Sequence, residues 1–155
     1  MSRIASVFIR AKHTALIPYI TVGYPTIETT LKVVPLFTGI GCDIIELGIP
    51  FSDPLADGAT IQQASYEALR QGVTTSVCFE VAQELRRQVQ IPLIFMTYYN
   101  PVLKFGLEKF CSKCAEVGID GLIIPDLPPE EGKGLEKSVK KHSLDLVYLL
   151  SPAST

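Results

Sequence analysis

The sequence predicts an α/β fold and, within that class, the first five parallel strands of an incomplete (β/α)8 TIM barrel. Short apolar runs alternate with segments of helical periodicity, and the runs are almost continuously hydrophobic. Strands buried on both faces have this composition, and helical crossovers between them make the strands parallel. A complete barrel has eight such units and about 250 residues, whereas this chain has 155. We therefore expect residues 1–155 to be the N-terminal part of one barrel domain whose C-terminal remainder is absent.

The elements are expected in a regular order that begins with a helix at residues 2–12. The parallel strands are expected in apolar runs at residues 16–23, 43–50, 91–100, 120–127 and 144–150. Between the strands, apolar residues recur at helical spacing. This spacing predicts helices at residues 26–37, 58–72, 75–89 and 106–118, and the charged run 136–141 is expected to be a solvated helix face.

Local signals support two of these helices. In the segment 58–72, small and apolar residues fall on one side of a helix and Gly72 is a suitable C-terminal stop. Pro35 lies near the end of the segment 26–37 and is expected to end or kink that helix, because proline removes a backbone donor.

Composition excludes several classes of function. The net charge is −2 and the sequence has no basic patch, so no nucleic-acid partner and no polybasic membrane contact are expected. No apolar run reaches the roughly 18 residues of a membrane span. The N-terminal segment lacks the apolar core and the cleavage site of a signal peptide. A cytoplasmic location is the resulting expectation.

The four cysteines include a C-x-x-C pair, Cys111 and Cys114. This pair has helical spacing, and no second pair or paired histidines are present to complete a metal site. Free cysteine behaves as a small buried hydrophobe. Structural thiols in a reducing compartment are therefore favoured over a redox or zinc site, and no metal ligands are predicted.

Polar residues end the predicted strands, each shortly before a proline. They are Thr21, Glu46, Tyr98, Asp126 and Ser151. In barrels and in open α/β sheets, this carboxyl-terminal face of the sheet holds the active site. Glu46 is notable because a carboxylate in an apolar strand is costly unless it is paired, hydrogen-bonded or protonated. Desolvation by its apolar neighbours is expected to raise the pKa of Glu46 into a range useful for proton transfer.

The stretch ELGIPFSDPLADGATIQ resembles the signature of the tryptophan synthase alpha subunit family. The segments IPYITVGYP, FMTYYNPVLKFG and GLIIPDLPPEE resemble the same family, and the likeness runs from about Pro18 to the end. The resemblance implies a barrel that cleaves indole-3-glycerol phosphate to indole and glyceraldehyde 3-phosphate. Indole then passes to a beta subunit that makes tryptophan in an alpha2-beta2 hetero-tetramer. The pyridoxal phosphate belongs to that beta subunit, so no cofactor is expected in this chain.

The resemblance also implies roles for individual residues. Glu46 matches the family's general acid/base and Asp57 its second catalytic carboxylate, which the polar loop is expected to keep ionised. Tyr19 and Tyr98 match residues that line the indole site, together with Leu122 or a neighbour of it. Pro50 and Asp53 match a loop that contacts the beta subunit.

Other interpretations remain open from the residues alone. Glu46 could be held by a lysine or arginine inside the barrel, although the predicted strands bring no such cation inward. Asp53 and Asp57 could serve only as turn residues. Tyr98 and Tyr99 would point in opposite directions on a strand, so only one could face the site. The chain could be a lyase, another phosphate-handling barrel, or a catalytically silent fragment that contacts a beta subunit.

Overall fold

The computed structural model describes residues 1–11 and 13–150 and contains a five-stranded parallel sheet in the order β1-β2-β3-β4-β5. Each strand therefore pairs with the next strand in the sequence, which is the strand order of a (β/α) barrel. The bounds are β1 (Tyr19–Thr21), β2 (Ile45–Gly48), β3 (Leu93–Met96), β4 (Gly121–Ile123) and β5 (Asp145–Val147). The predicted strands are confirmed, although each is shorter than its apolar run. The polar end predicted for the fifth strand, Ser151, lies outside the described residues.

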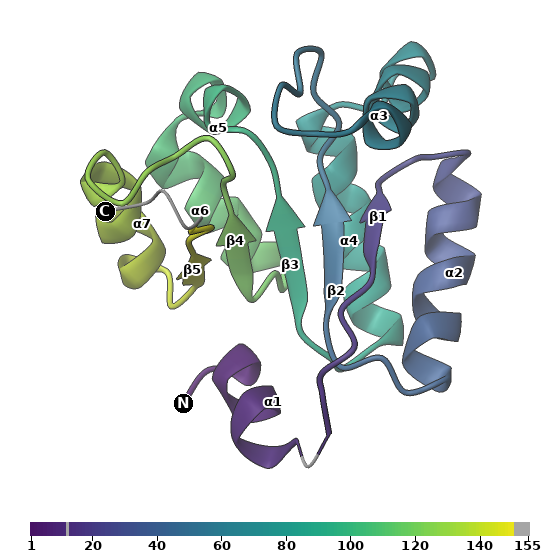
Figure 1. The fold of residues 1–155 in the computed structure, drawn as a ribbon, viewed down its shortest axis with the longest axis horizontal. Helices are drawn as coiled ribbons and strands as arrows, with labels where there is room; N and C mark the ends of the chain where they lie inside the picture. Colours follow the sequence, from purple (N-terminus) through teal and green to yellow (C-terminus); the bar gives the residue numbers. More distant parts are fainter. Residues whose placement is uncertain (12, 151–155) are drawn as a thin grey trace.

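Seven helices accompany the strands in the described part of the chain. They are α1 (Arg3–Arg10), α2 (Ile27–Gly39), α3 (Ala59–Arg70), α4 (Thr75–Gln88), α5 (Tyr99–Phe105), α6 (Leu107–Val117) and α7 (Lys133–Lys141). Figure 1 shows α2, α4, α6 and α7 along the sheet, α1 below it, and α3 and α5 beyond the tips of the strands. None of the helices in the described residues has both the length and the hydrophobicity that a membrane span requires.

The sheet has a hydrophobic cluster on each face. The larger cluster lies between the sheet and the helices along it. In this cluster the ring centroid of Phe79 lies 5.7 Å from that of Phe95 and 5.4 Å from that of Phe110. The smaller cluster lies on the opposite, inner face and consists of Ile4, Ile44, Ile94 and Ile123. Burial on both faces explains why the strand sequences are apolar throughout.

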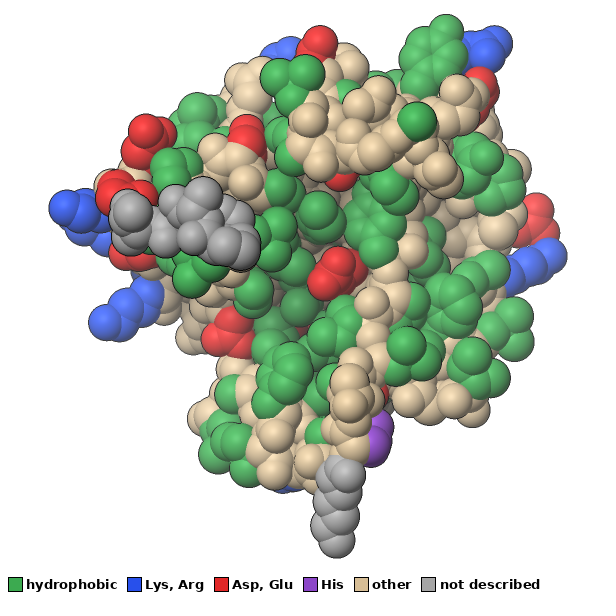
Figure 2. Space-filling view, viewed as in Figure 1, with side chains coloured by type: hydrophobic (Ala, Val, Ile, Leu, Met, Phe, Trp, Pro, Cys, Tyr) green, Lys and Arg blue, Asp and Glu red, His purple; other side chains and the backbone are tan. Residues whose placement is uncertain are grey.

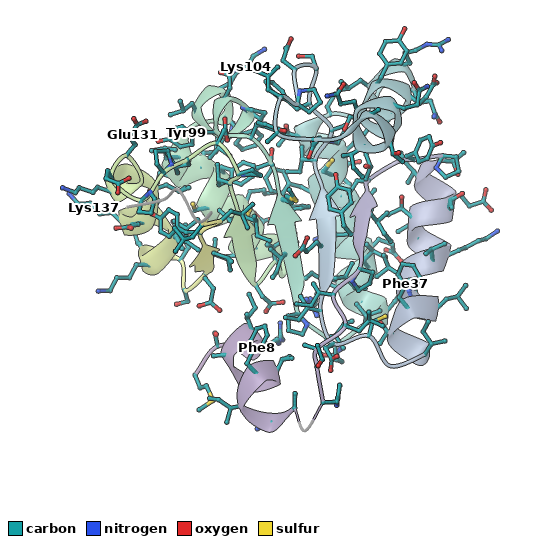
Figure 3. All side chains as sticks on the ribbon, in the orientation of Figure 1. Phe8, Phe37, Tyr99, Lys104, Glu131 and Lys137 are labelled. Atoms are coloured by element: carbon teal, nitrogen blue, oxygen red, sulfur yellow. The ribbon has the colours of Figure 1, made fainter. Side chains whose placement is uncertain are left out.

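Helix α1 packs against the inner face of the sheet. Its N-terminus is capped by Ser2, whose hydroxyl accepts a hydrogen bond from the Ala5 N–H at 3.1 Å. Ile4 is buried in the inner cluster, and Val7 packs against that cluster. On the same helix Phe8 is exposed, as Figure 3 shows below the sheet. The helix therefore covers the N-terminal end of the inner face and leaves the C-terminal ends of the strands free.

Pro35 does not end α2, because the helix continues to Gly39. A proline inside a helix removes one backbone hydrogen bond. Packing compensates here, since Val34 is fully buried in the outer cluster and Phe37 packs against it.

The predicted strand at residues 91–100 was too long, because β3 ends at Met96 and α5 begins at Tyr99. The Asp126 carboxylate accepts a hydrogen bond from the Tyr99 N–H at 2.8 Å and satisfies a free donor of this helix N-terminus. Pro101 lies in the first turn, where proline is tolerated. A partner 27 residues away in sequence therefore sets this boundary.

Candidate active site

Glu46 is the second residue of β2 and has its side chain on the inner face of the sheet, so the prediction that it ends its strand is wrong. Its neighbours across the strands are Tyr19 on β1 and Ile94 on β3. The residues directly beside it in sequence, Ile45 and Leu47, belong to the outer cluster instead. The apolar surroundings predicted from sequence thus exist, but Ile44 and Ile94 of the inner cluster supply them. Figure 2 shows an acidic side chain among hydrophobic ones near the centre of this face.

The Glu46 carboxyl group is half-buried and has no compensating cation. Burial alone raises its pKa above the ordinary value of 4.5. None of the ion pairs formed by the described residues includes Glu46. The structure therefore gives no support to a purely structural salt bridge at this position in the described residues.

Tyr19 lies close to the Glu46 strand because Gly48 leaves room for its ring. A Cβ atom at Gly48 would lie 2.0 Å from the Tyr19 hydroxyl oxygen. The Tyr19 hydroxyl also lies 3.3 Å from the Thr21 hydroxyl. Burial raises the pKa of Tyr19 to about 12, and the negative charges of Asp57 and Glu46 add to this rise. Tyr19 is therefore near enough to both carboxyl groups to sense their charge.

Asp57 follows a tight turn between β2 and α3. Its N–H donates to the Pro54 carbonyl oxygen at 3.0 Å, and its own carbonyl oxygen accepts from the Gln62 side chain at 2.9 Å. Desolvation raises the pKa of Asp57, and the Tyr98 hydroxyl, which hydrogen-bonds to the carboxylate, opposes this rise. The loop is thus less polar around Asp57 than the sequence indicated. The environments of the two carboxyl groups differ less than predicted.

Tyr98 links this loop to the end of β3. Its hydroxyl oxygen accepts a hydrogen bond from the Ala56 N–H at 2.9 Å, and its ring lies against that of Phe51 with centroids 5.2 Å apart. Tyr98 precedes α5 and is not on a strand. The predicted alternation of Tyr98 and Tyr99 on a strand is therefore wrong, although only Tyr98 reaches the Asp57 loop. Figure 3 shows Tyr99 on the α5 side of the molecule.

Two other predicted site residues lie in different surroundings. Leu122 is fully buried in the outer cluster, so it does not face the site, whereas its neighbour Ile123 is on the inner face. In the loop predicted to contact a partner, Asp53 is exposed but Pro50 is buried. Leu55, for which no sequence pattern indicated a role, has 91% of its surface exposed.

A small cavity brings several of these residues together. Its volume is about 10 Å³ and it is lined by Tyr19, Ile49, Phe51, Pro54, Asp57, Ser65, Met96, Thr97, Tyr98 and Pro125. Sequence reasoning missed Thr97 and Ser65. A threonine within an apolar strand run was the available signal for Thr97. Ser65 had only its place on the buried side of a predicted helix.

The cysteines do not form a site of their own. All four are buried and none is in a disulfide. Burial raises the pKa of the Cys111 thiol to about 11 and that of Cys114 well above its ordinary value. Within the described residues, no three histidine, cysteine or acidic side chains are grouped so that they could hold a metal ion.

A half-buried carboxyl group on a parallel strand, with Tyr19 on the neighbouring strand and with Asp57 and Tyr98 near that tyrosine, defines a barrel-type site suited to acid–base chemistry. The family model of the tryptophan synthase alpha chain matches residues 7–155. The chain therefore belongs to the tryptophan synthase alpha chain family.

Individual relatives agree with this assignment. The tryptophan synthase alpha chain of Dehalococcoides mccartyi is 57% identical over 155 residues, which are 100% of this chain and 60% of that relative. The crystal structure of tryptophan synthase subunit alpha from Legionella pneumophila superposes with a TM-score of 0.96 at 37% identity and covers 100% of this chain and 61% of that one. Tryptophan synthase from M. tuberculosis gives a TM-score of 0.94 at 37% identity, covering 99% and 63%. The five strands thus match the N-terminal part of the family's barrel, and the chain spans about 60% of the relative's length.

Proposed function

We propose that this chain provides the catalytic carboxyl groups of a tryptophan synthase alpha chain, which cleaves indole-3-glycerol phosphate to indole and glyceraldehyde 3-phosphate. The observation that carries the proposal is the half-buried Glu46 carboxyl group without a cationic partner on the inner face. Family membership and the nearby Asp57 and Tyr19 support it. Because the chain spans about 60% of a relative's length, the activity is proposed for a full-length alpha chain that contains these residues.

Glu46 is assigned the proton transfers. The cleaved bond joins indole C3 to the glycerol chain, and it breaks readily only after C3 has been protonated. The hydroxyl group beside the broken bond must lose its proton as it becomes the aldehyde. A carboxyl group whose pKa is raised by burial can give the first proton and take the second.

Asp57 is assigned the charge that develops on the ring. Protonation of C3 places positive charge on the indole nitrogen, and an anion there stabilises the intermediate. Asp57 is held by the backbone of its turn, and the nearby Tyr98 hydroxyl lowers the pKa of its carboxyl group. The Tyr19 and Tyr98 rings lie near Asp57 and offer apolar surface for the indole ring. All of these steps are proton transfers and charge stabilisation, so the proposed mechanism uses no cofactor in this chain.

The loop that follows β2 is proposed to contact the beta subunit. Asp53 and Leu55 are both exposed on this loop, and Leu55 has 91% of its surface accessible to solvent. Ser52 donates a hydrogen bond of 2.5 Å to the Asp53 carboxylate, which fixes the acidic group at the surface. An exposed leucine beside a fixed charge suits a protein partner better than bulk water. Pro50 supports this loop from beneath, because it is buried.

The test replaces Glu46 with glutamine in a full-length alpha chain that contains this segment. Indole release should fall by about 10²–10⁴-fold, the usual contribution of a positioned acid/base, while the circular dichroism spectrum stays unchanged. The matched control is Glu80→Gln on the exposed side of α4, which makes the same chemical change away from the sheet and should keep full activity. Near-normal turnover in the Glu46 variant would remove this residue from the mechanism.

The second candidate function is a catalytically silent chain that only contacts a beta subunit. The exposed Leu55 favours it, because partner contact needs no complete active site. Purified residues 1–155 should release no indole from indole-3-glycerol phosphate, even with a beta subunit present. Measurable indole release by this chain would reject the silent alternative.

A further inference from the structure

Thr97 is a buried polar residue that the proposed mechanism does not use. It follows β3, and its N–H donates to the Ile123 carbonyl oxygen at 3.1 Å. Only 2% of its surface is exposed. Its hydroxyl group has no hydrogen-bond partner among the described residues. A buried hydroxyl group without a partner loses its hydrogen bonds to water and destabilises the fold, so its position needs an explanation.

The cavity beside Thr97 has the size and the polarity to hold one water molecule. Its volume of about 10 Å³ is close to the minimum that admits a single water. A buried water needs two to four polar partners. Thr97, Ser65, Asp57 and the two tyrosines, all with polar side chains, are among the residues that line this cavity. Thr97 and Ser65 are themselves only 2% and 3% exposed, and of these two hydroxyl oxygens that of Thr97 is fully buried without a partner among the described residues.

We propose that Thr97 is a positioning residue that, with Ser65, holds one water molecule against the Asp57 carboxylate. The water accepts from or donates to the two buried hydroxyl groups and donates a hydrogen bond to Asp57. It thereby joins the end of β3 and helix α3 to the loop that carries Asp57. A role for this water in catalysis rests on the proposed function of Asp57. The binding of the water to Asp57 does not rest on that function.

The ionisable groups around Asp57 make the pKa of its carboxyl group a measure of the contact with the water. Tyr98 hydrogen-bonds to the carboxylate, and Tyr19 senses its charge. The negative charge of Glu46 raises the pKa of Tyr19, and that of Asp126 raises the pKa of Tyr98. The ionisable groups near Asp57 on β1, on β2 and in the loops after β3 and β4 are therefore tyrosines and carboxylic acids. No cation stands among these groups to keep Asp57 ionised. A water that donates to the carboxylate favours the ionised form and lowers its pKa.

The test compares Thr97→Val, which keeps the shape and removes the hydroxyl group, with Thr97→Ser, which keeps the hydroxyl group. The pKa of Asp57 is measured by carbon NMR of labelled aspartate carboxyl groups in this chain, without substrate. Thr97→Val should raise the pKa of Asp57 by about half a unit or more, because a hydrogen bond to the charged form is lost. Thr97→Ser should leave it nearly unchanged. Ser65→Ala on α3 removes the second hydroxyl group and should raise the pKa in the same direction.

Unfolding in urea at micromolar concentration gives an independent readout. Thr97→Val should increase the unfolding equilibrium constant about fivefold, the effect of losing one ordinary hydrogen bond. A hydroxyl group that truly lacks a partner would give the opposite result, because its removal stabilises the fold. A valine variant with an unchanged Asp57 pKa or with greater stability overturns the proposal. Neither readout involves turnover, so a failed Glu46 experiment would leave this result standing.

Discussion

Replacement of Gly48 by alanine should displace the Tyr19 ring from the inner face. The new Cβ atom would lie 2.0 Å from the Tyr19 hydroxyl oxygen and 2.5 Å from the adjoining ring carbon, whereas ordinary contacts begin at 3.4 Å. The ring is only partly buried and can swing away from β2. Overpacking of this kind costs about 1–3 kcal/mol. We therefore expect a loss of that size in the free energy of unfolding, measured by urea denaturation.

The ionisation of Tyr19 reports whether the ring has moved. Burial holds its pKa at about 12, against 10.0 for an unperturbed tyrosine. The fold favours the neutral tyrosine. The stability gained by burying the neutral Tyr19 hydroxyl is therefore fully present below pH 10 and is lost as the pH rises through 12. In Gly48→Ala the pKa should fall towards 10, as followed by absorbance of the tyrosinate ion. Tyr148, whose pKa is also raised to about 12, should keep its value.

Gly39→Ala is the matched control, because a Cβ atom at this position in α2 meets nothing within 4 Å. It should leave Tyr19 untouched and change stability by no more than the helix preference for alanine, up to about 1 kcal/mol in its favour. If Gly48→Ala is as stable as the parent and titrates identically, Tyr19 does not depend on the space that glycine leaves. The assignment of Tyr19 to the substrate site would then lose its structural support.

Three further perturbations test other parts of the fold. Asp120→Asn should cost about 1–3 kcal/mol in urea denaturation, because the partly buried Arg86 guanidinium, which is 2.8 Å from Asp120, loses a charged hydrogen-bond partner. Cys114 is fully buried, so a thiol reagent should modify it only at the rate of unfolding, and fast modification would contradict the packing of α6. Lys141 and His142 lower the pKa of Glu108 to about 2 from 4.5. The stability that the ionised Glu108 carboxylate gains from these two partners should be fully present above pH 4.5 and should be lost as the pH falls towards 2. This pH dependence should disappear in Glu108→Gln.

The sequence was sufficient for the parallel strands and their order and for the anomalous acidic residue in the second strand. Nearly continuous apolar runs separated by helical segments admit few arrangements other than a parallel sheet with covered faces. A single acidic residue in the second run was then a local anomaly, and local anomalies in buried strands can be recognised without coordinates.

Contacts between distant segments were beyond the sequence. The end of β3 is set by Asp126, which accepts the hydrogen bond from Tyr99, and the local sequence YYNP is compatible with either a strand or a turn. The environment of Asp57 depends on Tyr98, 41 positions later in the chain, so its desolvation was not visible in a glycine-flanked loop. Thr97 meets Ser65 only because α3 folds over the end of β3.

The tuning of Glu46 depends on how much of the inner face is covered. In this chain the inner cluster contains four buried isoleucines, and Glu46 remains half-buried beside it. The edge strands of the described sheet are β1 and β5, and each pairs with only one other strand of that sheet. On β5, one buried oxygen of the Asp145 carboxylate has no hydrogen-bond partner in the described residues. Any further chain that covers this face removes water from Glu46 without bringing a cation from the described strands. Its pKa should therefore be higher in a full-length alpha chain than in residues 1–155, and an equal or lower value would show that the added chain supplies positive charge to the site.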